Sequence, residues 1–223
     1  MEAGRGMIEE AINTVREIIP YMISILPDAI LPASGIYAIF TLSYTFGMFF
    51  FSLVEARLIL WALHNFAHSS MGIGFAEPND ELCRNRVTYM HDNEDFMGGA
   101  GGRQFSTPST PMYMLSVAGA YIFNTLNNQS KELEALGPAF STRYYVSLTF
   151  MILIVLLVGS FRLLYGCESF YNVLVSSLVG LIVGSLLVVQ NVRLFGDSSV
   201  NMLGIPQLRN KTASGKKLYV CPK

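Results

Sequence analysis

Residues 144–189 read YYVSLTFMILIVLLVGSFRLLYGCESFYNVLVSSLVGLIVGSLLVV, two long apolar runs separated by a short polar connection. About 20 apolar residues suffice to cross a bilayer as a helix, and the runs Tyr144–Leu164 and Phe170–Val189 both reach that length. The charged residues of the whole stretch are Arg162 and Glu168, and both lie at the connection. The stretch therefore predicts two transmembrane helices joined by a tight loop.

The composition of the 223-residue chain agrees with a membrane protein. Hydrophobic residues make up 52% and charged residues 14%, whereas a soluble domain carries about 25% charged residues. The net charge of −1 provides no general attraction to nucleic acid, so we expect no nucleic-acid partner. The three cysteines, Cys83, Cys167 and Cys221, form no C-x-x-C pair, and we expect neither a metal nor a cofactor.

Two further stretches are predicted to span the membrane. The first, Ile36–Leu63, is aromatic-rich, and the second, Pro111–Leu126, is short but uncharged. Before them, apolar residues recur at helical spacing over residues 7–31, which predicts an amphipathic helix on the membrane surface, broken at its prolines Pro20, Pro27 and Pro32. The predicted fold class is thus all-α, a polytopic transmembrane helical bundle of about four spans plus an N-terminal amphipathic helix.

This organisation divides the chain into a membrane helical domain, residues 1–189, and a polar basic tail, residues 190–223. The membrane domain includes a polar loop over residues 64–110. Residues 1–20 contain four glutamates and no apolar core followed by a cleavage site, so we expect no cleavable signal peptide. The first span then also serves as the insertion signal.

The distribution of basic residues predicts the orientation. With four spans, one side of the membrane receives ten Lys and Arg residues, and the other side receives three. Basic residues favour the cytoplasmic side, so we expect both termini in the cytoplasm. The ten are Arg5, Arg16, Lys131, Arg143, Arg193, Arg209, Lys211, Lys216, Lys217 and Lys223, and the three are Arg84, Arg86 and Arg103.

The connection between the two apolar runs carries the most specific motif of the sequence. Residues 160–180 read SFRLLYGCESFYNVLVSSLVG. In this segment Glu168 lies six positions after Arg162, and Asn172 lies four positions after Glu168. The spacing resembles the last signature of the type-2 phosphatidic-acid phosphatase and haloperoxidase superfamily, which is an Arg, a nucleophilic His and an Asp. The alternative is that the pattern is only the start of an ordinary apolar helix.

A second signature of that family, Pro-Ser-Gly-His, is similar to residues 108–111, which read Pro-Ser-Thr-Pro. The remaining family signature has no counterpart in residues 64–107. The resemblance covers about residues 105–190 and implies the helical framework of the family without its chemistry. The three catalytic positions are degenerate, because they hold Pro111, Glu168 and Asn172.

These replacements remove each catalytic role. Pro111 has no proton to donate, Asn172 has no charge to stabilise an imidazolium, and the carboxylate of Glu168 repels a phosphate. The resemblance leaves Ser109 and Arg162 as a possible contact for a phosphate or lipid headgroup, since a guanidinium suits phosphate. The alternative for Arg162 is a side chain at a helix end that extends to the membrane interface.

Three other features have structural explanations. Ser176, Gly180 and Gly184 recur every fourth residue, a pattern that lets two helix backbones pack closely. His64 and His68 lie four residues apart on one helix face but have no clear third metal ligand. Cys83 and Cys167 fall on the same non-cytoplasmic side, where the sequence allows either a disulfide or two free thiols.

The functional expectation is a catalytically inactive, phosphatase-like membrane protein, a structural or lipid-contacting component of a larger membrane assembly. The alternative is a lipid phosphate phosphatase with altered catalytic residues. The expected partners are membrane lipids and a protein that docks residues 190–223, although the tail could instead lie on anionic lipid. The tail also resembles those of membrane proteins in large eukaryotic DNA viruses, which implies a virion internal membrane as one possible location.

Overall fold

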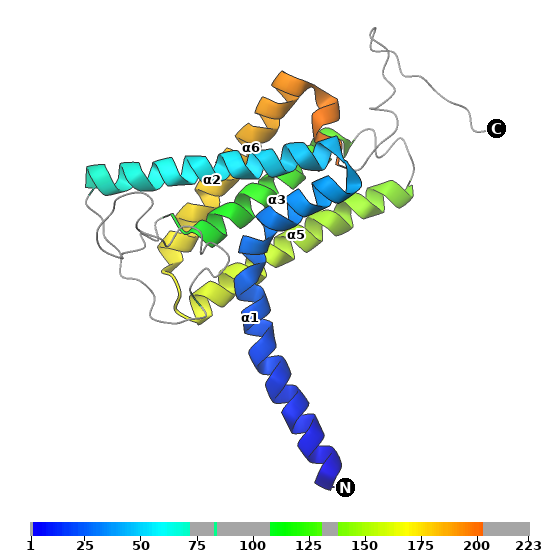
Figure 1. Cartoon of the computed structure of the whole chain (residues 1–223), viewed down its shortest axis with the longest axis vertical. Helices are drawn as coiled ribbons and strands as arrows, with labels where there is room; N and C mark the ends of the chain where they lie inside the picture. Colours follow the sequence, from blue (N-terminus) through cyan, green and yellow to red (C-terminus); the bar gives the residue numbers. More distant parts are fainter. Residues whose placement is uncertain (1, 72–82, 84–107, 131–137, 203–223) are drawn as a thin grey trace, which may run out of the picture.

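The structure, a computed structural model, describes residues 2–71, Cys83, 108–130 and 138–202. In this part of the chain every regular element is helical, so the all-α prediction is confirmed (Figure 1). The elements are α1 (Glu2–Thr41), α2 (Tyr44–Met71), α3 (Thr110–Asn128), α5 (Pro138–Leu164), α6 (Phe170–Phe195) and the short 3-10 helix η3 (Asp197–Val200).

Four of these helices contain a segment that is long and apolar enough to cross a bilayer. The predicted polytopic transmembrane bundle is therefore confirmed, and the apolar runs of residues 144–189 form α5 and α6. The four segments are Ile18–Thr41 in α1, Tyr44–Phe66 in α2, Tyr144–Leu164 in α5 and Phe170–Phe195 in α6.

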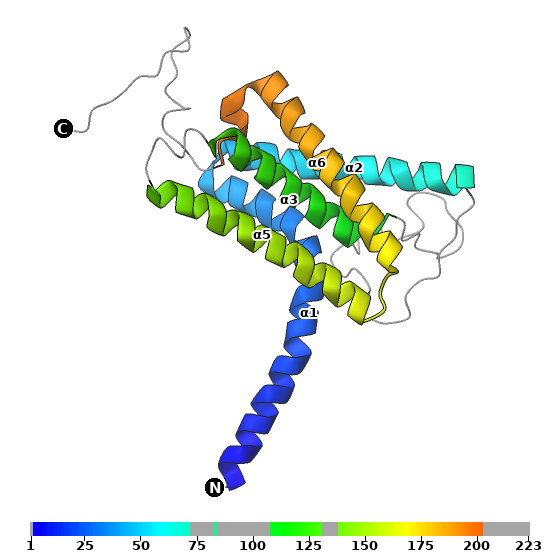
Figure 2. The same ribbon diagram turned by 180° about the vertical axis from the view of Figure 1, so that it is seen from behind.

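The prediction of one continuous span over Ile36–Leu63 is wrong. The chain reverses at Leu42 and Ser43, where Leu42 adopts a positive φ of 48° and the Ser43 amide donates to the carbonyl of Ala38 at 3.2 Å. The last half of α1 and α2 then lie side by side as a helical hairpin (Figures 1 and 2). Hydropathy cannot reveal this turn, because apolar residues surround it on both sides.

The predicted break of the N-terminal helix at its prolines is also wrong. Pro20, Pro27 and Pro32 all lie inside α1, which continues to Thr41. An interior proline removes one backbone hydrogen bond and bends a helix, but helices in membranes tolerate this because neighbouring groups compensate. In both views the first turns of α1 run away from the bundle, and its last turns pack within it (Figures 1 and 2).

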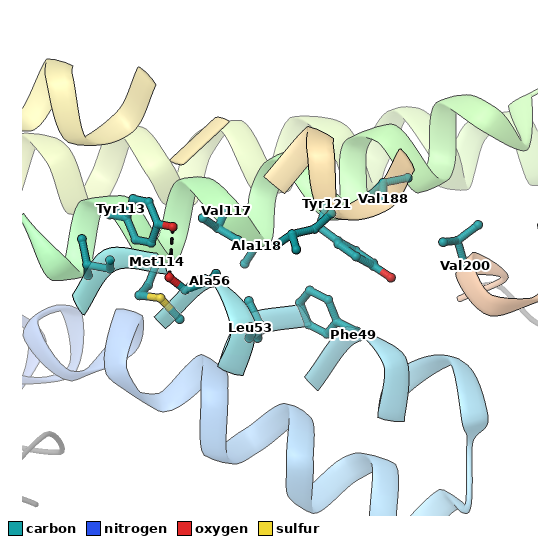
Figure 3. Packing of buried hydrophobic residues seen from close by; sticks show 12 residues of the cluster. Phe49, Leu53, Ala56, Tyr113, Met114, Val117, Ala118, Tyr121, Val188 and Val200 are labelled. Atoms are coloured by element: carbon teal, nitrogen blue, oxygen red, sulfur yellow. Dashed lines mark hydrogen bonds between the residues drawn. The ribbon is translucent and has the colours of Figure 1, made fainter. Parts of the chain in front are cut away.

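Helix α3 forms the centre of the bundle. Twelve of its 19 residues are buried, and its side chains build most of the core with α2 and α6 (Figure 3). Tyr113 is fully buried, and its hydroxyl donates to the carbonyl of Ala56 in α2 at 3.0 Å. The stretch Pro111–Leu126 is thus helical, as α3, but α3 is not among the four helices that are long and apolar enough to cross a bilayer. It lies mostly against protein, which explains why it can be less apolar than its neighbours.

The chain after α6 packs back onto the core before the tail begins. Val200 is 2% exposed, and its carbonyl accepts from Nε2 of Gln129 at the end of α3, 3.0 Å away. Asn191 in α6 donates through Nδ2 to the hydroxyls of Ser52 and Tyr121, both at 2.8 Å. The tail was expected from residue 190, but the structure extends α6 to Phe195 and places Val200 in the core.

Candidate functional site

The residues that carry the resemblance come together at one end of the bundle. Ser109 precedes α3, Arg162 lies in the last turn of α5, and Glu168 lies in the connection to α6. Asn172 and Ser176 lie in the first turns of α6. Residues separated by up to 67 positions in the sequence therefore form one continuous hydrogen-bonded group.

Glu168 is the centre of this group. Its Oε1 accepts from Nε of Arg162 at 2.6 Å and from the hydroxyl of Ser109 at 2.5 Å. The side chains of Arg162 and Glu168 are 5% and 3% exposed, so this is a buried ion pair. The second carboxylate oxygen of Glu168 is buried and has no hydrogen-bond partner.

A second set of hydrogen bonds ties α3 to α6 beside the ion pair. The amide of Ser109 donates to the hydroxyl of Ser176 at 2.6 Å, and that hydroxyl donates to the carbonyl of Asn172 at 2.6 Å. The hydroxyl of Ser169 caps α6 by accepting from the Asn172 amide at 3.3 Å. These contacts fix the start of α3 against the first turns of α6.

Pro111 stands in the first turn of α3 and is buried. A proline is favourable there, because the first amides of a helix have no partner within the helix. Its ring therefore has a structural role in starting α3, and it brings no proton donor to the site.

Three ionisable residues near this end were not assigned to a site from the sequence. His64 in α2 contacts the carbonyl of Pro108 through Nε2 at 2.9 Å, next to Ser109. Asp28 in α1 lies within electrostatic reach of both Arg57 in α2 and Arg162, and its Oδ2 is buried without a hydrogen-bond partner. Asp28 could not be assigned to this site from the sequence, because the unpredicted helical hairpin is what brings α1 alongside α2 and α5.

A disulfide between Cys83 and Cys167 lies directly beside this group in the chain, since Cys167 precedes Glu168. The sequence left both a bridge and two free thiols open, and the structure has the bridge, with the two Cα atoms 5.2 Å apart. The bridge attaches Cys83 to the connection that holds the Glu168 carboxylate. Among the residues that the structure describes, no group of three or more His, Cys, Asp or Glu side chains is placed to hold a metal.

The small residues of α6 lie against α3. A Cβ atom on Gly180 would be 2.6 Å from the backbone oxygen of Tyr113 and 2.8 Å from Cβ of Ser116. A Cβ atom on Gly184 would meet the backbone oxygen of Val117 even more closely. Ser176 stands one turn earlier on the same stripe and makes the hydrogen bonds described above. The stripe thus allows the most extensive helix contact of the bundle, between α3 and α6.

The arrangement has the form of an anion site whose anion is supplied by the protein. Arg162 and Ser109 are typical donors to an oxyanion, and the carboxylate of Glu168 accepts from both. The chain matches no protein-family model, and searches of curated proteins and of solved structures find no significant match.

Proposed function

We propose that this chain is a catalytically inactive, phosphatase-like membrane protein that acts as a structural or lipid-contacting component of a larger membrane assembly. The observation that carries the proposal is the buried contact of Glu168 with Arg162 and Ser109. The resemblance leaves Arg162, together with Ser109, as the residues that would contact a phosphate. Here Glu168 engages Nε of Arg162, and a second anion at this position would be repelled by the carboxylate.

The chemistry of the neighbouring residues supports the same proposal. Asn172 and Pro111 provide neither a nucleophile nor a proton donor. The hydrogen bonds of Ser109 and Ser176 join α3 to α6, which is a structural task. We therefore assign the polar group the role of holding three chain segments together at one end of the bundle.

Contact with lipid is supported by the outer surface and by a cavity. Large apolar side chains of α5 and α6 are exposed, among them Phe150, Leu156, Ile182 and Leu186. A cavity of about 520 Å³ lies between α3, α5 and α6, and its lining is almost entirely apolar. Its size is that of a site for one small ligand, and its lining suits an acyl chain.

An assay of phosphate release tests the absence of catalysis. The purified protein in detergent is given phosphatidic acid or a chromogenic phosphate ester, and a preparation from cells without the gene serves as the control. We expect no phosphate above that control. Release that disappears in Glu168→Ala would overturn the proposal.

One observation favours the alternative of a phosphatase with altered residues. His64 lies beside the site through its contact with Pro108, and an imidazole is the usual group for proton transfer at neutral pH. The variant His64→Ala decides between the two functions. Phosphate release by the wild type that is lost in His64→Ala would establish the altered enzyme, with His64 as its acid or base.

We further propose that residues 203–223 dock on a protein partner in the assembly, on the cytoplasmic side of the membrane; a virion membrane is one assembly of this kind. The run Leu218–Cys221 suits addition to the edge of a partner's sheet. Truncation after Met202 tests this and keeps Val200, which belongs to the core cluster. We expect membrane insertion to survive and incorporation into the native assembly to fail, whereas normal incorporation would leave the tail a role on the lipid surface.

A further inference from the structure

We infer that all five long helices cross the bilayer, so that the residues before Ile18 and the tail lie on opposite sides, with the Cys83–Cys167 disulfide on the non-cytoplasmic side. This inference concerns the interaction of the protein with the lipid surface and does not depend on the proposed function. It differs from the expectation of two cytoplasmic termini because the helical hairpin adds one crossing.

The contacts define two ends of the bundle. At the disulfide end lie Ser109, the Arg162–Glu168 pair and the bridge itself, and Asp28 of α1 is within electrostatic reach of Arg162. At the opposite end, the hairpin end, Gln129 contacts the carbonyl of Val200. Phe49, from the first turns of α2, belongs to the same core cluster as Val200. Helix α1 therefore runs from the disulfide end to the hairpin end, and α2 returns.

Two groups of aromatic side chains mark where the bilayer lies. Tyrosine and tryptophan concentrate at both membrane interfaces, where their rings meet the lipid headgroups. Seven tyrosine and tryptophan residues lie near the two ends of the lipid-facing helices and are at least 41% exposed. The disulfide end has Tyr21, Trp61, Tyr165 and Tyr171, and the hairpin end has Tyr37, Tyr44 and Tyr145.

The separation of the two groups fits a bilayer. At 1.5 Å per residue, Tyr44 and Trp61 are about 26 Å apart along α2. The same rise places Tyr145 and Tyr165 about 30 Å apart along α5. A hydrocarbon core is about 30 Å thick, so α2 and α5 cross it, and the last half of α1 accompanies α2 between the two ends as the other arm of the hairpin.

The tyrosines of α3 are buried rather than exposed, as expected of a crossing helix that other helices enclose. Its two tyrosines, Tyr113 and Tyr121, are both 0% exposed and hydrogen-bonded to neighbouring helices. Its 19 residues give a length of about 28 Å, which is enough to cross the hydrocarbon core. Within the part of the chain that the structure describes, the crossing helices therefore number five, and an odd number puts the two ends on opposite sides.

Two independent features give the direction. Disulfides persist in oxidising compartments and are rare in the cytosol, which places Cys83 and Cys167 on the non-cytoplasmic side. Basic residues favour the cytoplasm. Apart from Arg57 and Arg162, eight Lys and Arg lie in sequence at or beyond the hairpin end, against five on the other side, a smaller bias in the same direction. Both features put the tail in the cytoplasm and the residues before Ile18 outside it.

Fluorescence of Trp61, the one tryptophan of the chain, tests the position of the interface. The protein is placed in vesicles that contain phosphatidylcholine brominated either near the glycerol end or near the methyl end of its acyl chains. We expect stronger quenching by the shallow bromines. Stronger quenching by the deep bromines would place Trp61 inside the hydrocarbon and would overturn the assignment of the aromatic groups to the interfaces.

Labelling with a membrane-impermeant maleimide tests the crossings and the direction. In the wild type the bridge leaves Cys221 as the reporter of the tail, and Ala3→Cys in a Cys221→Ser background reports the other end. In right-side-out vesicles without reductant, we expect Ala3→Cys to react before permeabilisation and Cys221 only after it. Reaction of both reporters under the same condition would overturn the five crossings. The reverse order would overturn the direction.

Discussion

At the scale of single residues, the buried pair of Arg162 and Glu168 determines how the end of the bundle is built. Removing two charges from water costs several kcal/mol per ion, and their attraction compensates only when the geometry is good. Here the pair is close, and Ser109 adds a hydrogen bond to the same carboxylate oxygen. Removing either partner leaves the other as an uncompensated buried charge, so the two residues depend on each other.

A double-mutant cycle measures this dependence. We expect Arg162→Met alone to lower the free energy of unfolding by about 3–5 kcal/mol, because Glu168 then stays buried without its partner. The double variant Arg162→Met with Glu168→Leu should lose less than the single variant, since neither charge remains. The measurement is unfolding in mixtures of detergent and sodium dodecyl sulfate. Additive losses in the double variant would contradict a direct coupling of the two side chains.

At the scale of helices, the close packing of α3 and α6 depends on residues without side chains. Gly180 faces the backbone of Tyr113, and a backbone atom cannot rotate away as a side-chain end can. Gly47 in α2 is the opposite case, since a Cβ added there would meet nothing within 4 Å. The two glycines thus form a matched pair for substitution by alanine.

We expect Gly180→Ala to destabilise the protein by about 1–3 kcal/mol, because the added methyl group forces α3 and α6 apart. Gly47→Ala should be neutral or should stabilise it by up to about 1 kcal/mol, as alanine favours the helix. Unfolding in the same detergent mixtures compares the two variants with the wild type. Equal effects of the two substitutions would mean that the α3–α6 contact does not depend on Gly180.

The sequence predicts these elements to different degrees, for physical reasons. The apolar runs that form α5 and α6 are visible because hydropathy over about 20 residues is a strong signal. The turn at Leu42 is not visible, because apolar residues flank it on both sides and no charge or glycine marks it. The continuity of α1 through Pro27 is likewise hidden, since it depends on neighbouring helices rather than on local preference.

The hydrogen-bonded group around Glu168 was also predictable only in part. The motif spacing brought Arg162, Glu168 and Ser109 into consideration, and the span count placed them on one side of the membrane. Their direct hydrogen bonds could not be predicted, because these depend on how far α3 and α6 approach each other. The place of Asp28 near Arg57 and Arg162 depends on the hairpin, which hydropathy does not reveal, so it could not be predicted from the sequence.

At the scale of the whole molecule, polar contacts join the helices at one end of the bundle and inside its core. The disulfide end has the Arg162–Glu168 pair, and Asn191 of α6 binds Ser52 of α2 and Tyr121 of α3 within the bundle. Between them the core consists mainly of apolar side chains of α2, α3 and α6 (Figure 3). In a bilayer, where lipid is as apolar as the side chains, such polar contacts and close packing hold helices together.

The Cys83–Cys167 bridge adds a covalent constraint at the disulfide end, across a sequence separation of 84 residues. A bridge of this kind stabilises mainly by restricting the unfolded chain, typically by about 2–4 kcal/mol. We therefore expect Cys83→Ser with Cys167→Ser to lower the free energy of unfolding by about that amount, while Cys221→Ser leaves it unchanged. Because Cys167 adjoins Glu168, the double variant should also weaken the coupling measured in the Arg162–Glu168 cycle.

A count of reactive thiols shows whether loss of the Cys83–Cys167 bridge causes the lower free energy of unfolding in the double serine variant. Denatured without reductant, the wild type should present one reactive thiol, that of Cys221, and with reductant it should present all three cysteines. Reductant should lower the stability of the wild type to that of the double serine variant and should leave that variant unchanged. Three reactive thiols before reduction would contradict the bridge, and would also remove the redox argument for placing this end of the bundle outside the cytoplasm.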